Sequence, residues 1–270
     1  VVIVCVLNSI MQSNDTILII GDSWAATWIG SSGDVMNEYA GALPHRRSSV
    51  YGPNRDGNHR LTIDQCLLQK GYEVINKSWF GCSNIDTICA GIQYMRYRAP
   101  QLPKIKLVIF FNTELSRNWR WLQLDGLQES IETNETQPLK AGHLTHWLNR
   151  LHTIQAQVLT HLRELTPDAQ WAIIGGQAPL YKPEEYQWAD YIKEDWRSEL
   201  VGYTLPYSHT MSTQEIVSNI FDLETREIEL NKYEVIRKAL EKSDRFNDGV
   251  HPNHQCHQAL AEELIAHFNL

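Results

Sequence analysis

The chain has 270 residues, of which 43% are hydrophobic and 21% charged, values typical of a folded globular protein and unlike those of a disordered chain. Lys and Arg number 24 against 32 Asp and Glu, so the net charge is −8. This acidic balance argues against nucleic acid as a partner, because phosphate binding needs a basic surface. The five Cys have no paired spacing and indicate neither a disulfide framework nor a four-cysteine zinc site.

Residues 1–14 are expected to be an N-terminal extension outside the folded domain. The apolar run Val1–Leu7 is too short to span a bilayer, and it lacks the basic residues that begin a signal peptide. Because a Met stands at position 11, the residues before it are interpreted as upstream read-through, an expression scar or the remnant of a cleaved leader. No membrane span is predicted, and both a cytoplasmic and a secreted location stay open.

Four short apolar runs are predicted to be strands buried on both faces, as in a parallel sheet covered by helices: Thr16–Ile20, Glu73–Asn76, Lys106–Phe111 and Gln170–Gly175. Helical patterns are expected at Leu61–Lys70, Leu144–Leu165 and Asn253–Phe268. Their alternation predicts an α/β fold with three layers, α/β/α, around a mostly parallel sheet of about five strands.

Two stretches, 115–142 and 179–245, do not fit this alternation and are expected to be insertions. The first is polar, and the second is charged, aromatic and mostly helix-like, with a strand expected only near 200–205. Within the second, Leu223–Lys242 is interpreted as a solvated helix face. Because no repeat or flexible linker divides the chain, residues 15–270 are expected to form a single domain with helical insertions.

A serine directly after the first predicted strand is the first candidate for chemistry. In open parallel sheets the loops at the carboxyl ends of strands build the ligand site, which is where Gly21-Asp22-Ser23 falls. Near the other end of the chain, Asp248 and His251 stand three positions apart in a glycine-containing turn. Serine becomes a good nucleophile when an imidazole takes its proton and a carboxylate orients that ring. The alternative for each residue is an ordinary turn or loop role.

The order of these motifs resembles the SGNH hydrolases, also called GDSL esterases and lipases. The matching blocks are Gly-Asp-Ser ending at Ser23, a glycine after the second strand at Gly81, an asparagine after the third at Asn112, and Asp-Gly-Val-His from Asp248 to His251. The resemblance covers about residues 15–270. It implies a flavodoxin-like sheet and a serine esterase that needs no cofactor or metal.

The resemblance also implies a role for each of these residues. Ser23 would attack an acyl ester, His251 would act as general base and then acid, and Asp248 would orient His251. The oxyanion would be held by the backbone N–H groups of Ser23 and Gly81 and by the side-chain amide of Asn112. The expected substrate is a small-molecule or glycan ester with a short acyl chain, most simply acetyl.

One block departs from the family pattern around the oxyanion asparagine. Phe111 stands where family members usually have glycine, and Thr113 stands where they have Asp. The nine Trp are more than a core of this size needs. Four aromatic residues close to the catalytic blocks are therefore expected to line the substrate cleft, with core packing as the alternative for each: Trp24, Trp79, Phe111 and Trp119.

Three alternatives stay open at this level. The departures and the Trp content are compatible with a non-catalytic glycan-binding module on the same scaffold. The same triad also serves an acyltransferase or thioesterase. His254 and His257 lie one helical turn apart beside Cys256, which resembles a zinc site, but Cys256 points off their face and His251 is better used in the triad. The sequence leaves the oligomeric state open.

Overall fold

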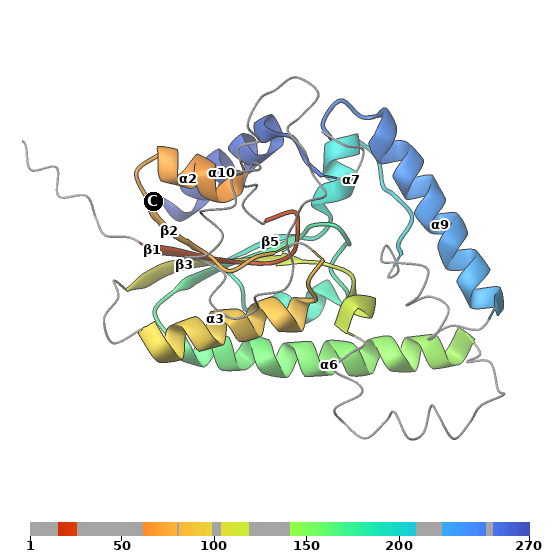
Figure 1. Cartoon of the computed structure of the whole chain (residues 1–270), viewed down its shortest axis with the longest axis horizontal. Helices are drawn as coiled ribbons and strands as arrows, with labels where there is room; N and C mark the ends of the chain where they lie inside the picture. Colours follow the sequence, from red (N-terminus) through yellow and green to blue (C-terminus); the bar gives the residue numbers. More distant parts are fainter. Residues whose placement is uncertain are drawn as a thin grey trace, which may run out of the picture.

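The computed structural model describes residues 16–25, 62–79, 81–98, 104–118, 141–208, 223–246 and 251–270. At its centre is a parallel five-stranded sheet in the order β2-β1-β3-β4-β5 (Figure 1). This is the flavodoxin-like order of doubly wound α/β proteins, so the predicted fold class is confirmed. The strands are β1 (Thr16–Ile20), β2 (Glu73–Asn76), β3 (Ile105–Asn112), β4 (Gln170–Gly175) and β5 (Tyr191–Lys193).

The fifth strand corrects one expectation. The sequence pattern placed a strand near 200–205, but Leu200 belongs to helix α7 (Trp196–Val201) and the strand is instead β5, where Ile192 pairs with Ile173 of β4. β5 is a short, partly exposed edge strand, so it has no apolar run that would reveal it. The stretch 179–245 therefore contributes to the sheet as well as to the surface around it.

Helices cover both faces of the sheet (Figure 1). Helices α2 (Ile63–Gln69) and α10 (His254–Phe268) lie on one face, and α3 (Asn84–Arg98) and α6 (Ala141–Leu165) lie on the other. Helix α9 (Leu223–Lys242) has an exposed face, as expected, and packs Ile236 and Leu240 into the core. Two 3₁₀ helices, η2 (Leu115–Asn118) and η3 (Pro183–Tyr186), follow β3 and β4. Among the described helices, none is long and apolar enough to cross a membrane.

The core is divided between the two faces because successive side chains of a strand point to opposite sides. In β1, Ile17 and Ile19 join the cluster under α2 and α10, whereas Leu18 and Ile20 join the cluster under α3 and α6. All four side chains are fully buried. This two-sided burial is what produced the unbroken apolar run in the sequence.

Candidate active site

The strand order reverses between β1 and β3, and the first candidate residues lie at this point. β2 flanks β1 on one side, and β3, β4 and β5 follow on the other. Ile20, the last residue of β1, pairs with Phe110 in β3, so the segments after both strands leave the sheet at the same edge. Ligands of doubly wound proteins bind outside the carboxyl ends of the strands at such a switch point.

Ser23 lies in the turn that follows β1. It is partly exposed, whereas the other residues of the turn, 21–25, are buried. The Asp22 carboxylate accepts a hydrogen bond from the Trp24 N–H at 3.0 Å, and the Ala25 N–H donates to the Asp22 carbonyl at 3.1 Å. The side chain of Asn76, at the end of β2, donates to the Ala25 carbonyl at 2.7 Å. The turn is therefore fixed on both sides of the serine.

Gly21 is required where β1 meets β3. A Cβ at this position would lie 2.6 Å from the Cβ of Phe111, closer than two carbon atoms that are not bonded to each other can approach. The absence of a side chain lets the chain turn directly against Phe111 and present Ser23 at the edge of the sheet. The Gly-Asp-Ser motif thus has a packing reason for its first residue and a hydrogen-bonding reason for its second.

A buried charged group that sequence reasoning missed lies beneath this turn. The Arg117 Nε lies 2.6 Å from a Glu114 carboxylate oxygen, its Nη1 lies 3.8 Å from Asp22 Oδ2, and its Nη2 donates to Gln177 Oε1 at 2.8 Å. Glu114 and Asp22 are both fully buried. Burial raises the pKa of the Asp22 carboxyl, while the Arg117 guanidinium acts in the opposite direction. The only sequence signal was a Glu-x-x-Arg spacing directly after the third strand.

Gly81 follows β2 in a left-handed conformation, with a φ of 68° that strongly favours glycine. It is exposed, and a Cβ there would meet no described residue within 4 Å, so the conformation rather than crowding accounts for the glycine. The adjacent Cys82 thiol donates to the Gly21 carbonyl at 3.1 Å. This contact ties the Gly81 segment to the start of the Ser23 turn.

Asn112 ends β3 and is 2% exposed. Its Nδ2 donates to the Thr113 carbonyl at 3.0 Å, and its Oδ1 accepts hydrogen bonds from Asn84 and Gln155 at 3.2 and 3.1 Å. Gly176, which follows β4, lies between Asn112 and the turn that holds Ser23. A Cβ on Gly176 would lie 3.3 Å from the Asn112 carbonyl oxygen and 3.8 Å from Trp24 Cβ. Asn112 therefore lies at the same edge of the sheet as Ser23, and its side-chain amide belongs to a polar network.

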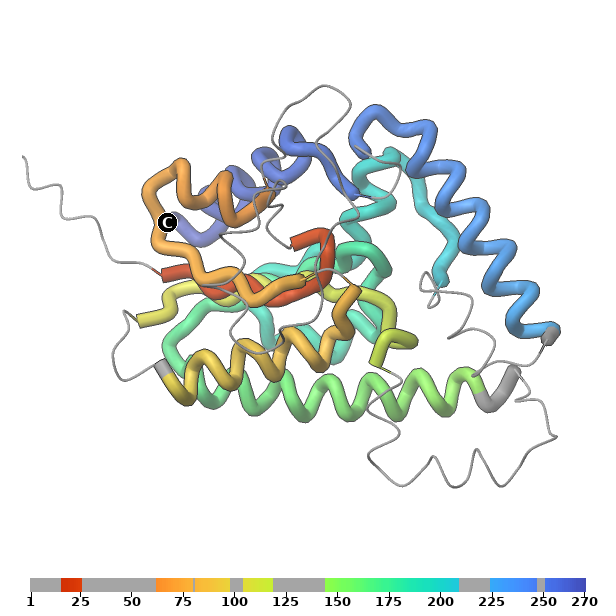
Figure 2. Tube along the Cα trace, viewed as in Figure 1, coloured from red at the N-terminus to blue at the C-terminus, as the bar shows by residue number. Residues whose placement is uncertain are grey.

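The catalytic Asp expected at position 248 lies outside the described residues. His251 is half-buried and precedes Pro252, which forms a β-bridge with Phe246. The Phe246 ring lies 5.9 Å from that of Trp24, the neighbour of Ser23. Figure 2 shows the segment that enters α10 at the same end of the sheet as the turn after β1. A hydrogen bond between Ser23 and His251 stays a prediction.

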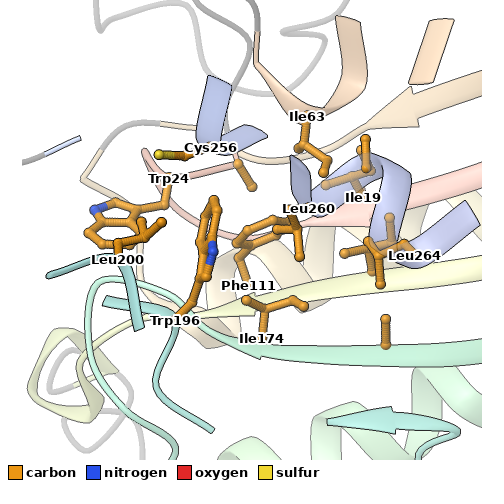
Figure 3. Close-up of a cluster of buried hydrophobic side chains, with 14 of the residues drawn as sticks. Ile19, Trp24, Ile63, Phe111, Ile174, Trp196, Leu200, Cys256, Leu260 and Leu264 are labelled. Atoms are coloured by element: carbon orange, nitrogen blue, oxygen red, sulfur yellow. The ribbon is translucent and has the colours of Figure 1, made fainter. Parts of the chain in front are cut away.

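The aromatic residues expected around the cleft separate into different environments. Trp24 and Phe111 are fully buried, and both pack against Trp196 with ring centroids 5.7 and 5.9 Å away (Figure 3). These rings therefore have the core-packing role that the sequence left as an alternative. Trp79 is partly exposed beside the Gly81 segment. Trp119 lies outside the described residues.

The histidines of the zinc alternative do not form a metal centre with other described residues. Across the described ranges, no group of three or more His, Cys, Asp or Glu side chains is arranged to hold a metal ion. The His257 ring is buried and packs edge-on against Trp196, with the centroids 5.6 Å apart. Burial, with a contribution from His251 and His254, lowers the pKa of His257 to about 3. His257 is thus a neutral core residue at ordinary pH.

No family model and no curated protein matches this sequence. Among solved structures, the psychrotrophic esterase EstA from Pseudoalteromonas sp. is 13% identical with a TM-score of 0.33, over 94% of this chain and 97% of that one. A lipase from a goat rumen metagenome is 11% identical with a TM-score of 0.35, over 94% and 97% of the two chains. A lipase/acylhydrolase from Enterococcus faecalis is 10% identical with a TM-score of 0.30, over 93% and 94%. Similarity at this level does not transfer an activity to this chain.

Proposed function

We propose that this chain is a serine ester hydrolase of the SGNH type, with Ser23 as its nucleophile. The observation that carries the proposal is the setting of Ser23, a partly exposed serine in a turn whose other residues are buried. That turn leaves β1 beside β3, at the edge where doubly wound proteins bind their ligands. The ordered sequence blocks that end in His251 supply the partner for the serine.

In the proposed reaction the Ser23 Oγ adds to the ester carbonyl carbon, and its proton passes to the imidazole of His251. The tetrahedral intermediate collapses by breaking the bond to the alcohol, which leaves with the proton from His251. A water molecule, deprotonated by His251, then adds to the acyl-serine. Breakdown of the second intermediate returns a proton to Ser23 Oγ and releases the carboxylic acid. Asp248 is proposed to hold the tautomer of His251 and to stabilise its cation.

The negative oxygen of each intermediate is proposed to be held by the backbone N–H groups of Ser23 and Gly81 and the amide of Asn112. Removal of one such donor typically costs about 10²- to 10³-fold in kcat. The left-handed backbone of Gly81 and the tie from Cys82 to Gly21 support the pairing of the two backbone donors. The hydrogen bonds to Asn112 Oδ1 support an amide whose nitrogen is turned away from Asn84 and Gln155.

The proposed substrates are esters with short acyl chains, most simply acetyl esters of small molecules or glycans. Asn112 is 2% exposed, so little space is open beside its amide, which supports a small acyl group. The partly exposed Trp79 offers a ring on which the alcohol part, such as a sugar, can stack. Trp119 stays a candidate for the same surface.

The test is hydrolysis of p-nitrophenyl acetate together with labelling by a fluorophosphonate. Ser23→Ala should lose labelling and lower kcat by at least about 10⁴-fold, because no other group supplies the nucleophile. Ser78→Ala is the matched control, since Ser78 lies at the same edge of the sheet and its buried hydroxyl has no hydrogen-bond partner among the described residues. This control should keep both properties.

Two results would contradict the proposal. Undiminished turnover in Ser23→Ala would remove the serine from the mechanism. Binding of glycans without any Ser23-dependent hydrolysis would favour the non-catalytic module instead. A panel of nitrophenyl esters from acetyl to octanoyl tests the finer part, and a preference for octanoyl would rule out the short-chain site.

A further inference from the structure

Four buried side-chain amides, from Asn84, Asn112, Asn118 and Gln155, meet where β3 leaves the sheet. Each is 2% exposed or less. Gln155 lies in α6 at their centre and uses every hydrogen-bonding position that its amide offers in this setting. Its Oε1 accepts from Asn84 and Asn118 at 2.9 and 3.0 Å, and its Nε2 donates to Asn112 Oδ1 and to the Tyr186 hydroxyl, both at 3.1 Å. None of these bonds follows from the motifs discussed above.

Two backbone N–H groups fix the orientation of the outer amides. The Thr113 N–H donates to Asn84 Oδ1 at 2.8 Å, and the Ile85 N–H donates to Asn118 Oδ1 at 3.1 Å. A backbone N–H is only ever a donor, so both asparagines must present oxygen to it and turn their NH₂ groups the other way. Those NH₂ groups face Gln155, which must therefore present its oxygen to them.

The orientation of Gln155 then determines that of Asn112. With Oε1 facing the two asparagines, the Gln155 Nε2 faces Asn112 and can only donate to it. Asn112 must therefore accept this hydrogen bond with Oδ1, which also accepts from Asn84 Nδ2 at 3.2 Å. A reversed Asn112 amide would set its NH₂ against two other NH₂ groups in a buried site, an arrangement that leaves donors unsatisfied. Asn112 Nδ2 consequently lies on the side away from Gln155, where it donates to the Thr113 carbonyl, an acceptor that it shares with Asn84 Nδ2.

We propose that Gln155 is a positioning residue that holds the Asn112 amide with its NH₂ group turned toward the oxyanion of the reaction. This inference rests on the proposed function, because it gives Asn112 a task only if an ester carbonyl is attacked beside it. One of the two hydrogens on Asn112 Nδ2 is donated to the Thr113 carbonyl at 3.0 Å, which fixes the plane of the amide. The other hydrogen is donated to the substrate oxyanion. Gln155 touches no reacting atom and acts through Asn112.

The test uses Gln155→Met, which keeps the length of the side chain and removes both the donor and the acceptor. Active sites are titrated with a fluorophosphonate, so that kcat refers to folded, reactive molecules. We expect kcat for p-nitrophenyl acetate to fall about 10- to 100-fold, since misplacing a group by an ångström costs up to about 10²-fold. KM should stay within about 3-fold, because the interaction is made chiefly in the transition state.

Tyr186→Phe is the matched control. It removes the second acceptor of the same Gln155 nitrogen, but the bonds from Asn84 and Asn118 still orient Gln155. Its kcat per titrated site should remain within about 3-fold of the parent value. Gln155→Glu is the second variant, in case Gln155→Met does not fold. It places an oxygen where Nε2 donates to Asn112, so the Asn112 amide should reverse and kcat should fall by a similar factor.

A double-mutant cycle separates positioning from general damage. In an Asn112→Ala background, Gln155→Met should cause no further loss of kcat, because the amide that it positions is absent. Full multiplication of the two effects, or an unchanged kcat in Gln155→Met, would overturn the inference and leave the esterase proposal standing. A parent protein without Ser23-dependent turnover or labelling would overturn the proposed function and this inference together.

Discussion

The two faces of the sheet bury different kinds of side chain next to the proposed site. On the face covered by α2 and α10, the rings of Trp24, Phe111 and Trp196 pack edge to face (Figure 3). On the face covered by α3 and α6, the amides of Asn112 and Gln155 belong to a hydrogen-bonded network. Hydrophobic burial is non-directional, whereas hydrogen bonds depend on angle. The first face therefore mainly supplies stability, and the second also fixes orientation.

The largest effect on stability is expected on the apolar face. Leu264 in α10 is fully buried there. Leu264→Ala should lower the free energy of unfolding by about 2–5 kcal/mol, through lost transfer energy and a residual cavity. Urea denaturation measures this change. Because Leu264 orients no polar group, kcat per titrated active site should stay at the parent value, and a large loss of kcat would break the comparison.

An intermediate effect is expected on the amide face. Asn118 accepts from the Ile85 N–H at the start of α3 and donates to Gln155. Asn118→Ala therefore leaves the buried Ile85 N–H without its acceptor, while Gln155 Oε1 keeps the bond from Asn84. This should cost about 1–3 kcal/mol of unfolding free energy. Because Asn118 also helps to orient Gln155, kcat per titrated site should fall, in contrast to Leu264→Ala. A variant that loses stability but keeps full kcat would show that orientation does not depend on this bond.

A smaller, pH-dependent effect is expected from His257 on the apolar face. Burial holds the pKa of His257 at about 3 in the folded protein, below its ordinary value of 6.5. Between these values the unfolded chain binds more protons, so stability is fully present above about pH 6.5 and declines as the pH falls toward 3. The slope for one group is at most about 1.4 kcal/mol per pH unit.

Urea denaturation of the parent and of His257→Phe across pH 4–7 measures this contribution. The variant should lose part of the acid dependence, because it has no imidazole to protonate in the unfolded state. His161→Gln, which removes a partly exposed histidine of α6, is the control and should retain the parent slope. Equal slopes in the parent and in His257→Phe would show that His257 is not a source of acid sensitivity.

The sequence predicted the parts of the fold whose signal is local. Thr16–Ile20 and Gln170–Gly175 are strands with the expected bounds, because both faces are buried and the apolar run is unbroken. α10 begins where expected, since Asn253 caps it by accepting from the Cys256 N–H at 3.0 Å. β5 could not be found in this way, because its three residues gain their conformation from pairing with β4.

The residues of the candidate site also differ in whether a local sequence signal predicts them. Ser23 could be predicted from its place directly after a predicted strand, whereas Gly81 and Asn112 were predicted only from the resemblance to a known family. Glu114 and Arg117 were not predicted, since charged side chains are rarely buried unless they are paired. Glu114 and Arg117 pair locally, three positions apart, but their place beneath Asp22 depends on the segments after β1 and β3 meeting in the folded chain.

The sequence by itself determined the layered α/β architecture and the order of the motif residues, because buried strands and turns depend mainly on the types of residue at neighbouring positions. Only the tertiary structure decided which residues support Ser23 and which way the Asn112 amide faces. That direction follows from two backbone N–H groups, at Thr113 and Ile85, acting through the amides of three other side chains. These groups are far apart in sequence, and a hydrogen bond acquires a direction only when both of its partners are in place.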